Sequence, residues 1–304
     1  MSPKDAIPPL PEPLKVAVAD SHTHLDMQET TVEEALAKAA SVGVTTVVQV
    51  GCDIKGSRWA AETAQAHENV HAAVALHPNE APRIVLGDPG GTSQPPGAGG
   101  GWSRQVARTP GGDSALDEAL AEIDRLAALP YVRAVGETGL DYFRTGEEGI
   151  AAQERSFRAH IEIAKRHGKA LVIHDREAHA DVLRVLAEEG APERTVFHCY
   201  SGDAAMAEIC AAQGYFMSFA GNVTFKNAQP LRDALAVAPL ELVLVETDAP
   251  FLTPAPYRGR PNAPYLIPVT VRAMAAVRGL GEEALCTAIA ANTARAFGLT
   301  RDTE

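Results

Sequence analysis

The stretch Asp20-Ser21-His22-Thr23-His24 ends the first predicted strand, Val16–Asp20, and decides between two α/β folds. An open doubly wound sheet would carry a glycine-rich phosphate loop at this point. This stretch instead holds two histidines spaced two residues apart and no glycine. We therefore predict a (β/α)8 TIM barrel, a fold whose active-site side chains lie at the carboxyl ends of the strands.

The rest of the chain repeats an alternation of short apolar runs and Ala-rich helical patterns, as a barrel requires. The eight predicted strands are Val16–Asp20, Val44–Val50, His71–Leu76, Val132–Glu137, Ala170–His174, Thr195–Cys199, Tyr215–Phe219 and Leu242–Thr247. The predicted helices are Val32–Val42, Ser57–His67, Ala115–Leu129, Ala152–Arg166, Ala178–Glu189, Ala204–Ala212, Asn227–Val237, Pro268–Arg278 and Glu282–Phe297.

Two segments depart from this pattern. Residues 1–15 contain five prolines, and we expect a flexible Pro-rich tail before a single domain over residues 16–299. Residues 87–112 hold nine glycines and four prolines, a composition that buries too little surface to offset its ordering entropy. We interpret this segment as a mobile insertion after the third strand. The alternative is a lid over the site, with Trp102, Arg104 and Arg108 as its contacts.

Composition excludes several classes of protein. The formal net charge of the 304 residues is −12, which argues against a broad basic surface that holds DNA. No apolar run approaches the roughly 18 residues of a membrane span, and the N-terminus lacks the apolar core of a signal peptide. The four cysteines are too few and too scattered for a disulfide framework. A cytoplasmic enzyme is the class that we expect.

Potential metal ligands recur at the carboxyl ends of the predicted strands, where a barrel places its active site. These six residues are His22, His24, Glu137, His174, His198 and Asp248. Taken singly, each histidine is explained as well by a satisfied core histidine, and Asp248 by a helix N-cap. Their joint occurrence at strand ends favours a metal centre.

The residue types at these positions suit two divalent ions. Residues i and i+2 of a strand point the same way, so His22 and His24 can reach one ion. Imidazole and carboxylate ligands accept zinc, manganese, magnesium, nickel or iron, and they suit calcium less well. Two such ions outweigh Glu137, Asp248 and a bridging hydroxide by one positive charge, which favours an anionic substrate. By the same period of two, Asp20 lies one layer below His22 and Glu246 one layer below Asp248, where carboxylates can support metal-bound imidazoles. Buried carboxylates paired with a neighbouring Lys or Arg are the competing interpretation.

Eight segments in order along the chain resemble the TatD-related metal-dependent deoxyribonucleases of the amidohydrolase superfamily. They are Asp20–Asp26, Ala75–Pro78, Val135–Tyr142, Ile173–Ala178, His198–Gly202, Ser218–Lys226, Glu246–Pro250 and Arg258–Asn262. The resemblance implies a TIM barrel in which His22, His24, Glu137 and Asp248 hold one ion. Glu137, His174 and His198 would hold the other.

The resemblance also implies a chemistry. Asp248 and Glu137 would be catalytic, with Asp248 as the general base for a water activated by the two metals. The family is associated with DNA hydrolysis, including 3′–5′ exonuclease action, and some members with D-aminoacyl-tRNA deacylation. The chain departs from the family at Asp175, where a small Ser or Cys is usual, and this puts substrate preference in doubt. Glu137 stands where the related phosphotriesterase group has a carbamylated lysine, which counts against that group.

Residues near the predicted mouth are candidates for substrate contact. They are His77, Arg176, Lys226, Arg258 and Arg260, of which the four cations can pair with phosphate oxygens. For each cation, a solvated surface charge is the competing interpretation. Among the aromatic residues, Tyr142, Phe143 and Phe225 are candidates to stack unpaired bases.

We therefore predict a metal-dependent phosphodiesterase that acts on single-stranded DNA from its 3′ end, with no membrane association and no obligate protein partner. Ester hydrolysis on D-aminoacyl-tRNA by the same centre is the alternative. A non-catalytic barrel that binds a partner through residues 87–112 is a further alternative, and the intact set of six ligands argues against it.

Overall fold

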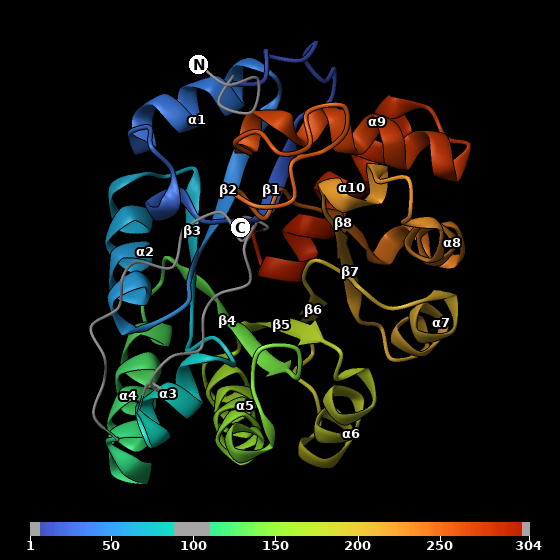
Figure 1. Cartoon of the computed structure of the whole chain (residues 1–304). Helices are drawn as coiled ribbons and strands as arrows, with labels where there is room; N and C mark the ends of the chain where they lie inside the picture. The colour runs from blue at the N-terminus through green and yellow to red at the C-terminus, as the bar shows by residue number, and fades with distance from the viewer. Residues whose placement is uncertain (1–6, 88–109, 300–304) are drawn as a thin grey trace, which may run out of the picture.

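The computed structural model describes residues 7–87 and 110–299, and within them eight parallel strands alternate with helices to form a nearly closed TIM barrel (Figure 1). The strands pair in chain order. Their bounds are β1 Val18–Thr23, β2 Val44–Gly51, β3 Val70–Val74, β4 Val132–Asp141, β5 Ala170–Arg176, β6 Thr195–Phe197, β7 Phe216–Phe219 and β8 Val243–Val245. The predicted fold class is confirmed.

The helices surround the strands (Figure 1). Their bounds are α1 Val32–Ser41, α2 Ile54–Ala66, α3 Glu80–Leu86, α4 Gly112–Ala127, α5 Glu147–His167, α6 His179–Glu189, α7 Ala204–Ala212, α8 Gln229–Val237, α9 Ile267–Arg278 and α10 Glu282–Phe297. Two of them begin at an Asp N-cap: the side chain of Asp53 accepts a hydrogen bond from Gly56 N, and that of Asp203 accepts one from Met206 N.

The core consists of two layers because successive strand residues face opposite sides. A small inner cluster includes Val48, Val172 and Leu244 and fills the barrel. Residues of the opposite parity, such as Val47 and Leu171, join a much larger cluster with the apolar faces of the helices. The strands are therefore buried on both sides, as expected for a parallel sheet.

The barrel closes where β1 meets the segment after β8. Thr23 and Ala249 form a parallel bridge. Asp248 N donates to His22 O at 2.9 Å, and His24 N donates to Ala249 O at 2.8 Å. Closure of the barrel thus brings two candidate ligands near the start of the chain, His22 and His24, next to Asp248 near the end of the barrel sequence.

Several predicted strand boundaries were wrong, and one helix was not predicted. Strand β4 runs four residues past Glu137, whereas β8 ends at Val245 and leaves Asp248 in the segment that follows it. Helix α3 was not predicted, because it spans only seven residues and carries Pro82 within it. The glycine-rich segment therefore follows α3 rather than β3 directly. Most of it, including Trp102, Arg104 and Arg108, lies outside the described residues.

Residues 7–15, the described part of the predicted Pro-rich tail, contact the barrel. Leu14 is buried and its N–H donates to Val42 O at 3.0 Å. The hydroxyl of Tyr265 donates to Pro8 O at 2.8 Å. These contacts tie the segment to α1 and to the region before α9.

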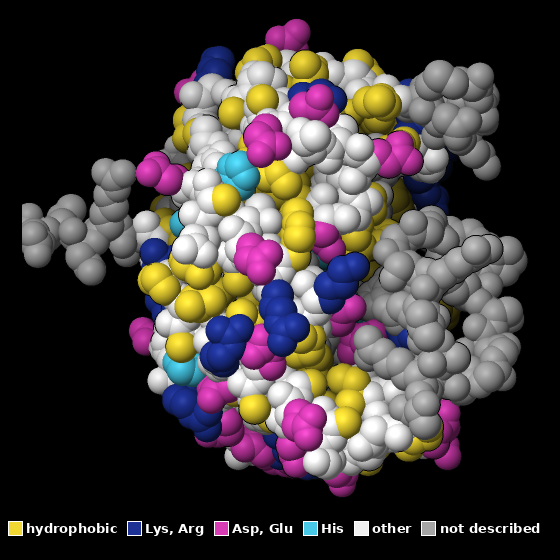
Figure 2. Space-filling view, turned by 90° about the vertical axis from the view of Figure 1, so that its left-hand side faces the viewer, with side chains coloured by type: hydrophobic (Ala, Val, Ile, Leu, Met, Phe, Trp, Pro, Cys, Tyr) yellow, Lys and Arg dark blue, Asp and Glu magenta, His cyan; other side chains and the backbone are white. Residues whose placement is uncertain are grey.

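The described surface carries charges of both signs. In Figure 2, acidic and basic side chains are interspersed over the visible face, and no broad basic surface covers it. Within the described ranges, no helix combines the length and apolar character needed to cross a bilayer.

Candidate metal centre

Two β-bulges direct ligand side chains into the mouth of the barrel. The register of β1 on β2 shifts between Asp20 and Thr23, and the register of β4 on β5 shifts between Val135 and Thr138. Each shift inserts one extra residue, which re-aims the local side chains. His22 lies in the first bulge and Glu137 in the second.

Glycine is required beside the second bulge. Gly139 has a φ of 134°, and a Cβ placed on it would lie 2.1 Å from the carbonyl oxygen of His174. The close approach of β4 to β5 brings His174 to the same carboxylate, because its Nδ1 lies 3.2 Å from Glu137 Oε2. The Gly-Glu-Thr-Gly sequence around Glu137 therefore serves the geometry of the site.

The first group of ligands surrounds Glu137 Oε1. His22 Nε2 and His24 Nε2 lie 3.3 Å apart, and they lie 3.9 and 3.8 Å from that oxygen. Asp248 Oδ1 completes the group at 3.8 Å from His22 Nε2 and 3.5 Å from His24 Nε2. Two imidazoles and two carboxylates thus converge on one point.

The second group surrounds Glu137 Oε2. His198 Nε2 lies 2.7 Å from this oxygen, and His174 Nδ1 lies 3.2 Å from it. The two imidazole nitrogens are 3.4 Å apart. The single carboxylate of Glu137 therefore presents one oxygen to each group, which is the arrangement of a carboxylate that bridges two cations.

The buried carboxylates of this cluster are stabilised by positive charge beside them. Burial alone raises the pKa of Glu137, but His198 and His77 outweigh it and hold that pKa well below its ordinary value. Burial lowers the pKa of His24, yet Asp248 and Glu137 raise it to about 9. Protons on His24, His174 and His198, whose pKa values are all raised, therefore balance the carboxylates, and divalent cations can replace those protons. The donor set of imidazole nitrogens and carboxylate oxygens fits zinc or manganese.

Buried carboxylates hold the outer nitrogens of two histidines. His198 Nδ1 lies 3.3 Å from Oε1 of Glu246, which the sequence offered as a candidate supporting carboxylate without naming His198 as its partner. His174 Nε2 lies 3.3 Å from Asp141 Oδ2, a contact that sequence reasoning missed. Metal-binding histidines are oriented by such partners.

Asp20 does not contact the imidazole of His22, the contact that its position in the sequence suggested. Its Oδ1 accepts hydrogen bonds from the backbone N–H groups of His22 and Thr247, and Oδ2 accepts one from the Thr247 hydroxyl. The imidazole Nδ1 of His22 is buried and has no hydrogen-bond partner among the described residues. Asp20 thus fixes the backbone at the barrel's closure rather than the ring, because the bulge turns the His22 ring away from it.

Two further side chains join the cluster. The thiol of Cys52, just after β2, donates to Glu137 Oε1 at 3.2 Å. His77 is buried, with its ring 4.5 Å from that of His174 and its Nε2 4.0 Å from Glu137 Oε2. Burial lowers the pKa of His77 to about 3. The sequence identified His77 as a candidate, whereas Cys52 was missed although it also follows a strand end.

The cationic candidates lie at the rim of the mouth. The guanidinium of Arg176 lies 3.8 Å from the ring centre of Phe143, which is 49% exposed. Arg258 lies 4.3 Å from the ring centre of Phe225, across the barrel from the first pair.

The other rim candidates differ in their surroundings. Arg260 lies 5.6 Å from the ring centre of Tyr257, and Lys226 is exposed. Asp175, the departure from the family pattern, places Oδ2 2.7 Å from His179 Nδ1. Its negative charge is therefore paired with α6.

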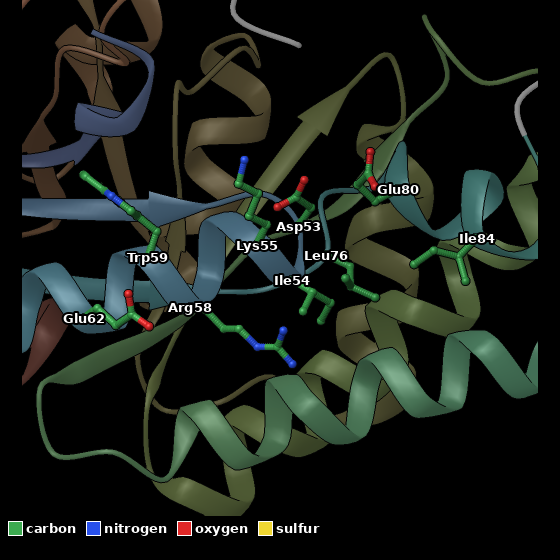
Figure 3. A pocket seen from close by; sticks show the side chains of 9 residues that line it. All are labelled: Asp53, Ile54, Lys55, Arg58, Trp59, Glu62, Leu76, Glu80 and Ile84. Carbon is green, nitrogen blue, oxygen red and sulfur yellow. The ribbon is translucent and has the colours of Figure 1, made fainter. Parts of the chain in front are cut away.

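A cavity of about 480 Å³ lies beside α2 and α3 (Figure 3). Its lining includes Ile54, Arg58 and Trp59 of α2 together with Leu76 and Ile84. None of the six candidate ligands lines this cavity, so it takes no part in the cluster.

The comparisons with known proteins agree with the geometry. A model of the family described as TatD related DNase matches residues 19–298. The chain belongs to this family.

TatD-family relatives match along nearly their full length. The uncharacterized metal-dependent hydrolase TatD of Mycobacterium tuberculosis is 41% identical over 290 residues, covering 93% of this chain and 98% of that protein. The uncharacterized metal-dependent hydrolase YcfH of Escherichia coli K12 is 34% identical over 286 residues, covering 92% and 95%. This chain is therefore a metal-dependent hydrolase of the TatD family.

Solved structures show the same fold. The crystal structure of YJJV, a TatD homolog from Escherichia coli K12, superposes with a TM-score of 0.78 at 24% identity, covering 93% of this chain and 98% of that one.

Proposed function

We propose that this TatD-family hydrolase cleaves phosphodiester bonds in single-stranded DNA, acting from the 3′ end. The observation that carries the proposal is the division of Glu137, whose two oxygens face two separate groups of nitrogen and oxygen donors. Two cations held side by side are the arrangement used by many phosphodiesterases. The family description as a DNase supports the same substrate.

The ligand assignment follows from the two groups. His22, His24, Glu137 and Asp248 would hold one divalent ion, and Glu137, His174 and His198 would hold the other. When bound, the two ions would polarise the phosphate ester and lower the pKa of a coordinated water.

Asp248 is the residue that we propose as general base. Its side chain is 14% exposed, whereas those of His22 and Glu137 are exposed by 0% and 5%. Its backbone has a φ of 52°, a strained conformation for a non-glycine residue that is concentrated at functional sites. A carboxylate that touches the first group of ligands and also reaches solvent can accept the proton of the attacking water.

The rim supplies the contacts for an anionic polymer. We propose that Arg176, Lys226, Arg258 and Arg260 pair with phosphate oxygens, and that His77 contacts the scissile group. A guanidinium held over the ring of Phe143 or Phe225 makes no hydrogen bond to that ring's edge, so its N–H groups can pair with a phosphate. The exposed part of Phe143 can stack an unpaired base.

The decisive experiment compares substrates under the same metal and salt conditions. Labelled single-stranded DNA with a free 3′ end is tested beside the same strand with a blocked 3′ end and beside D-aminoacyl-tRNA. The Glu137→Gln protein is the blank. Stepwise shortening of the free strand alone supports the proposal, whereas release of only the D-amino acid would assign the alternative ester hydrolysis.

We also propose a cytoplasmic location and action without an obligate protein partner. All six proposed ligands come from one chain, so the centre needs no residue from a partner. Fractionation of cells that express a tagged chain tests the location. Gel filtration beside the activity assay tests whether the isolated chain is active.

A further inference from the structure

Basic side chains, three of them cationic, gather at the amino ends of four neighbouring strands, the end of the barrel opposite the metal centre. His71 is the second residue of β3 and Arg133 the second residue of β4. Lys169 immediately precedes β5, and Arg194 immediately precedes β6. Since these strands pair in order, the four positions lie next to one another along one edge of the barrel.

Hydrogen bonds place Lys169 beside the Arg133 position and Arg194 beside the Lys169 position. Lys169 Nζ donates to Val132 O at 2.7 Å, one residue from Arg133, and to Leu129 O at 3.1 Å. The Arg194 guanidinium donates to the carbonyl of Gly168, one residue from Lys169. Each cation is therefore held beside the next by a neighbouring backbone carbonyl.

The described residues supply no anionic side chain for this row. No carboxylate among them pairs with Arg133, Lys169 or Arg194, and the Nε atom of Arg133 is buried with no hydrogen-bond partner. Burial together with Arg133 and Arg194 lowers the pKa of Lys169, and burial together with Arg133 lowers the pKa of His71 to about 4. The cations thus repel one another in a partly desolvated place.

Helix ends account for only part of the positive charge. Lys169 lies at the end of α4, and Arg194 lies at the ends of α5 and α10, close to Gly298. Each helix carboxyl end carries about −0.5 charge, so three ends offset roughly half of three full positive charges. A surplus of more than one positive charge remains in a protein whose net charge is −12.

We propose that Arg133, Lys169 and Arg194 form a binding site for a phosphate-type dianion at the amino end of the barrel. Arg133 presents a buried donor without a partner, and charge-assisted hydrogen bonds from guanidinium and ammonium groups match phosphate oxygens. The proposed anion site is separate from the metal centre, so evidence for or against it does not depend on the proposed nuclease activity.

Calorimetric titration of the metal-loaded protein tests the site, with inorganic phosphate in one arm and thymidine 5′-monophosphate in the other. We expect one equivalent of anion beyond any that the metal centre binds, and Arg133→Met should weaken that equivalent by about tenfold or more. Hydrolysis of a small phosphodiester should be unchanged. Arg166→Met is the matched control, since Arg166 is exposed and pairs with Asp124. Binding of both anions indicates phosphate monoesters, and binding of phosphate alone indicates the free ion; both results support the site.

Thermal unfolding separates binding from a purely structural role. Without phosphate, Arg133→Met should melt at or above the wild-type temperature because it removes a repelling charge. Phosphate should raise the melting temperature of the wild type and of Arg133→Lys, but not that of Arg133→Met. A lower melting temperature for Arg133→Met, or identical titrations for the wild type and Arg133→Met, would overturn the proposal.

Discussion

At the scale of single residues, Glu137 is the centre of the site. Five histidines of the described chain come within 4.0 Å of one or other of its oxygens. The sequence placed Glu137 at a strand end, and the resemblance implied a bridging role. The bulge directs the two oxygens of Glu137 toward different groups of side chains. This bulge could not be predicted, because it depends on how β4 pairs with β5.

Glu137→Gln should abolish most activity while the fold is retained. An amide is a poor ligand and cannot supply negative charge to both groups, so turnover should fall by at least about two orders of magnitude. Steady-state hydrolysis of a labelled strand and circular dichroism measure the two effects. Near-normal turnover in a correctly folded variant would contradict the two-ion mechanism.

The carboxylates behind the histidines should tune metal affinity. Glu246→Gln and Asp141→Asn keep the size of the side chain but remove the charge that faces His198 and His174. Affinity for zinc should fall by roughly 10–100-fold in each. Competition with a chromogenic chelator measures this loss. Glu162→Gln, an exposed change on the outer face of α5, is the control that should leave affinity unchanged.

At the scale of elements, the sequence predicted every strand and most helices, because the spacing of apolar residues and the glycines that flank the elements indicate them. Strand ends were less predictable. Strand β4 continues to Asp141 because it pairs with a long β5, whereas β8 stops at Val245. Helix α3 is short and was hidden beside the glycine-rich segment. Each of these errors concerns tertiary pairing or a weak local pattern.

His160 connects three of these elements. From α5, its Nε2 accepts a hydrogen bond from Leu76 N at 3.1 Å, and its Nδ1 donates to Ser156 O at 2.7 Å and lies 3.1 Å from the Thr138 hydroxyl. Burial lowers the pKa of His160 to about 4. The ring is thus held neutral between α5, β4 and the end of β3.

Stability should therefore fall in acid through His160. The imidazole of the unfolded chain has the ordinary pKa of about 6.5, whereas burial lowers the pKa of the folded chain to about 4. The full contribution to stability is therefore present above the higher pKa and is lost as pH falls toward the lower one. The advantage of wild type over His160→Gln should shrink by about 2–3 kcal/mol between roughly pH 7 and pH 4.5. Urea unfolding at several pH values measures it. A difference between the two proteins that stays constant with pH would refute the assignment.

At the scale of the whole molecule, the barrel brings ligands together from residues 22 to 248 of the chain. That convergence was predictable once the fold was, because every ligand was assigned to a strand's carboxyl end. The cationic row at the opposite end was not predicted, because its members follow no shared sequence pattern. They become neighbours only through strand order.

Metal removal should destabilise the whole molecule. The ligands come from β1, β4, β5, the segment after β6 and the segment after β8, so ions held there stabilise the folded form alone. Chelation should lower the melting temperature, and added zinc or manganese should restore it. Scanning calorimetry measures the shift. The same melting temperature with and without metal would contradict a centre that binds ions in the folded state.

The closure of β1 against the segment after β8 has a consequence for biosynthesis. A ribosome makes the two N-terminal histidines first and Asp248 more than two hundred residues later, yet backbone hydrogen bonds join His22 to Asp248 and His24 to Ala249. A nascent or prematurely terminated product therefore lacks a complete binding shell. The proposed metal centre therefore cannot assemble its full set of candidate ligands before Asp248 has been synthesised.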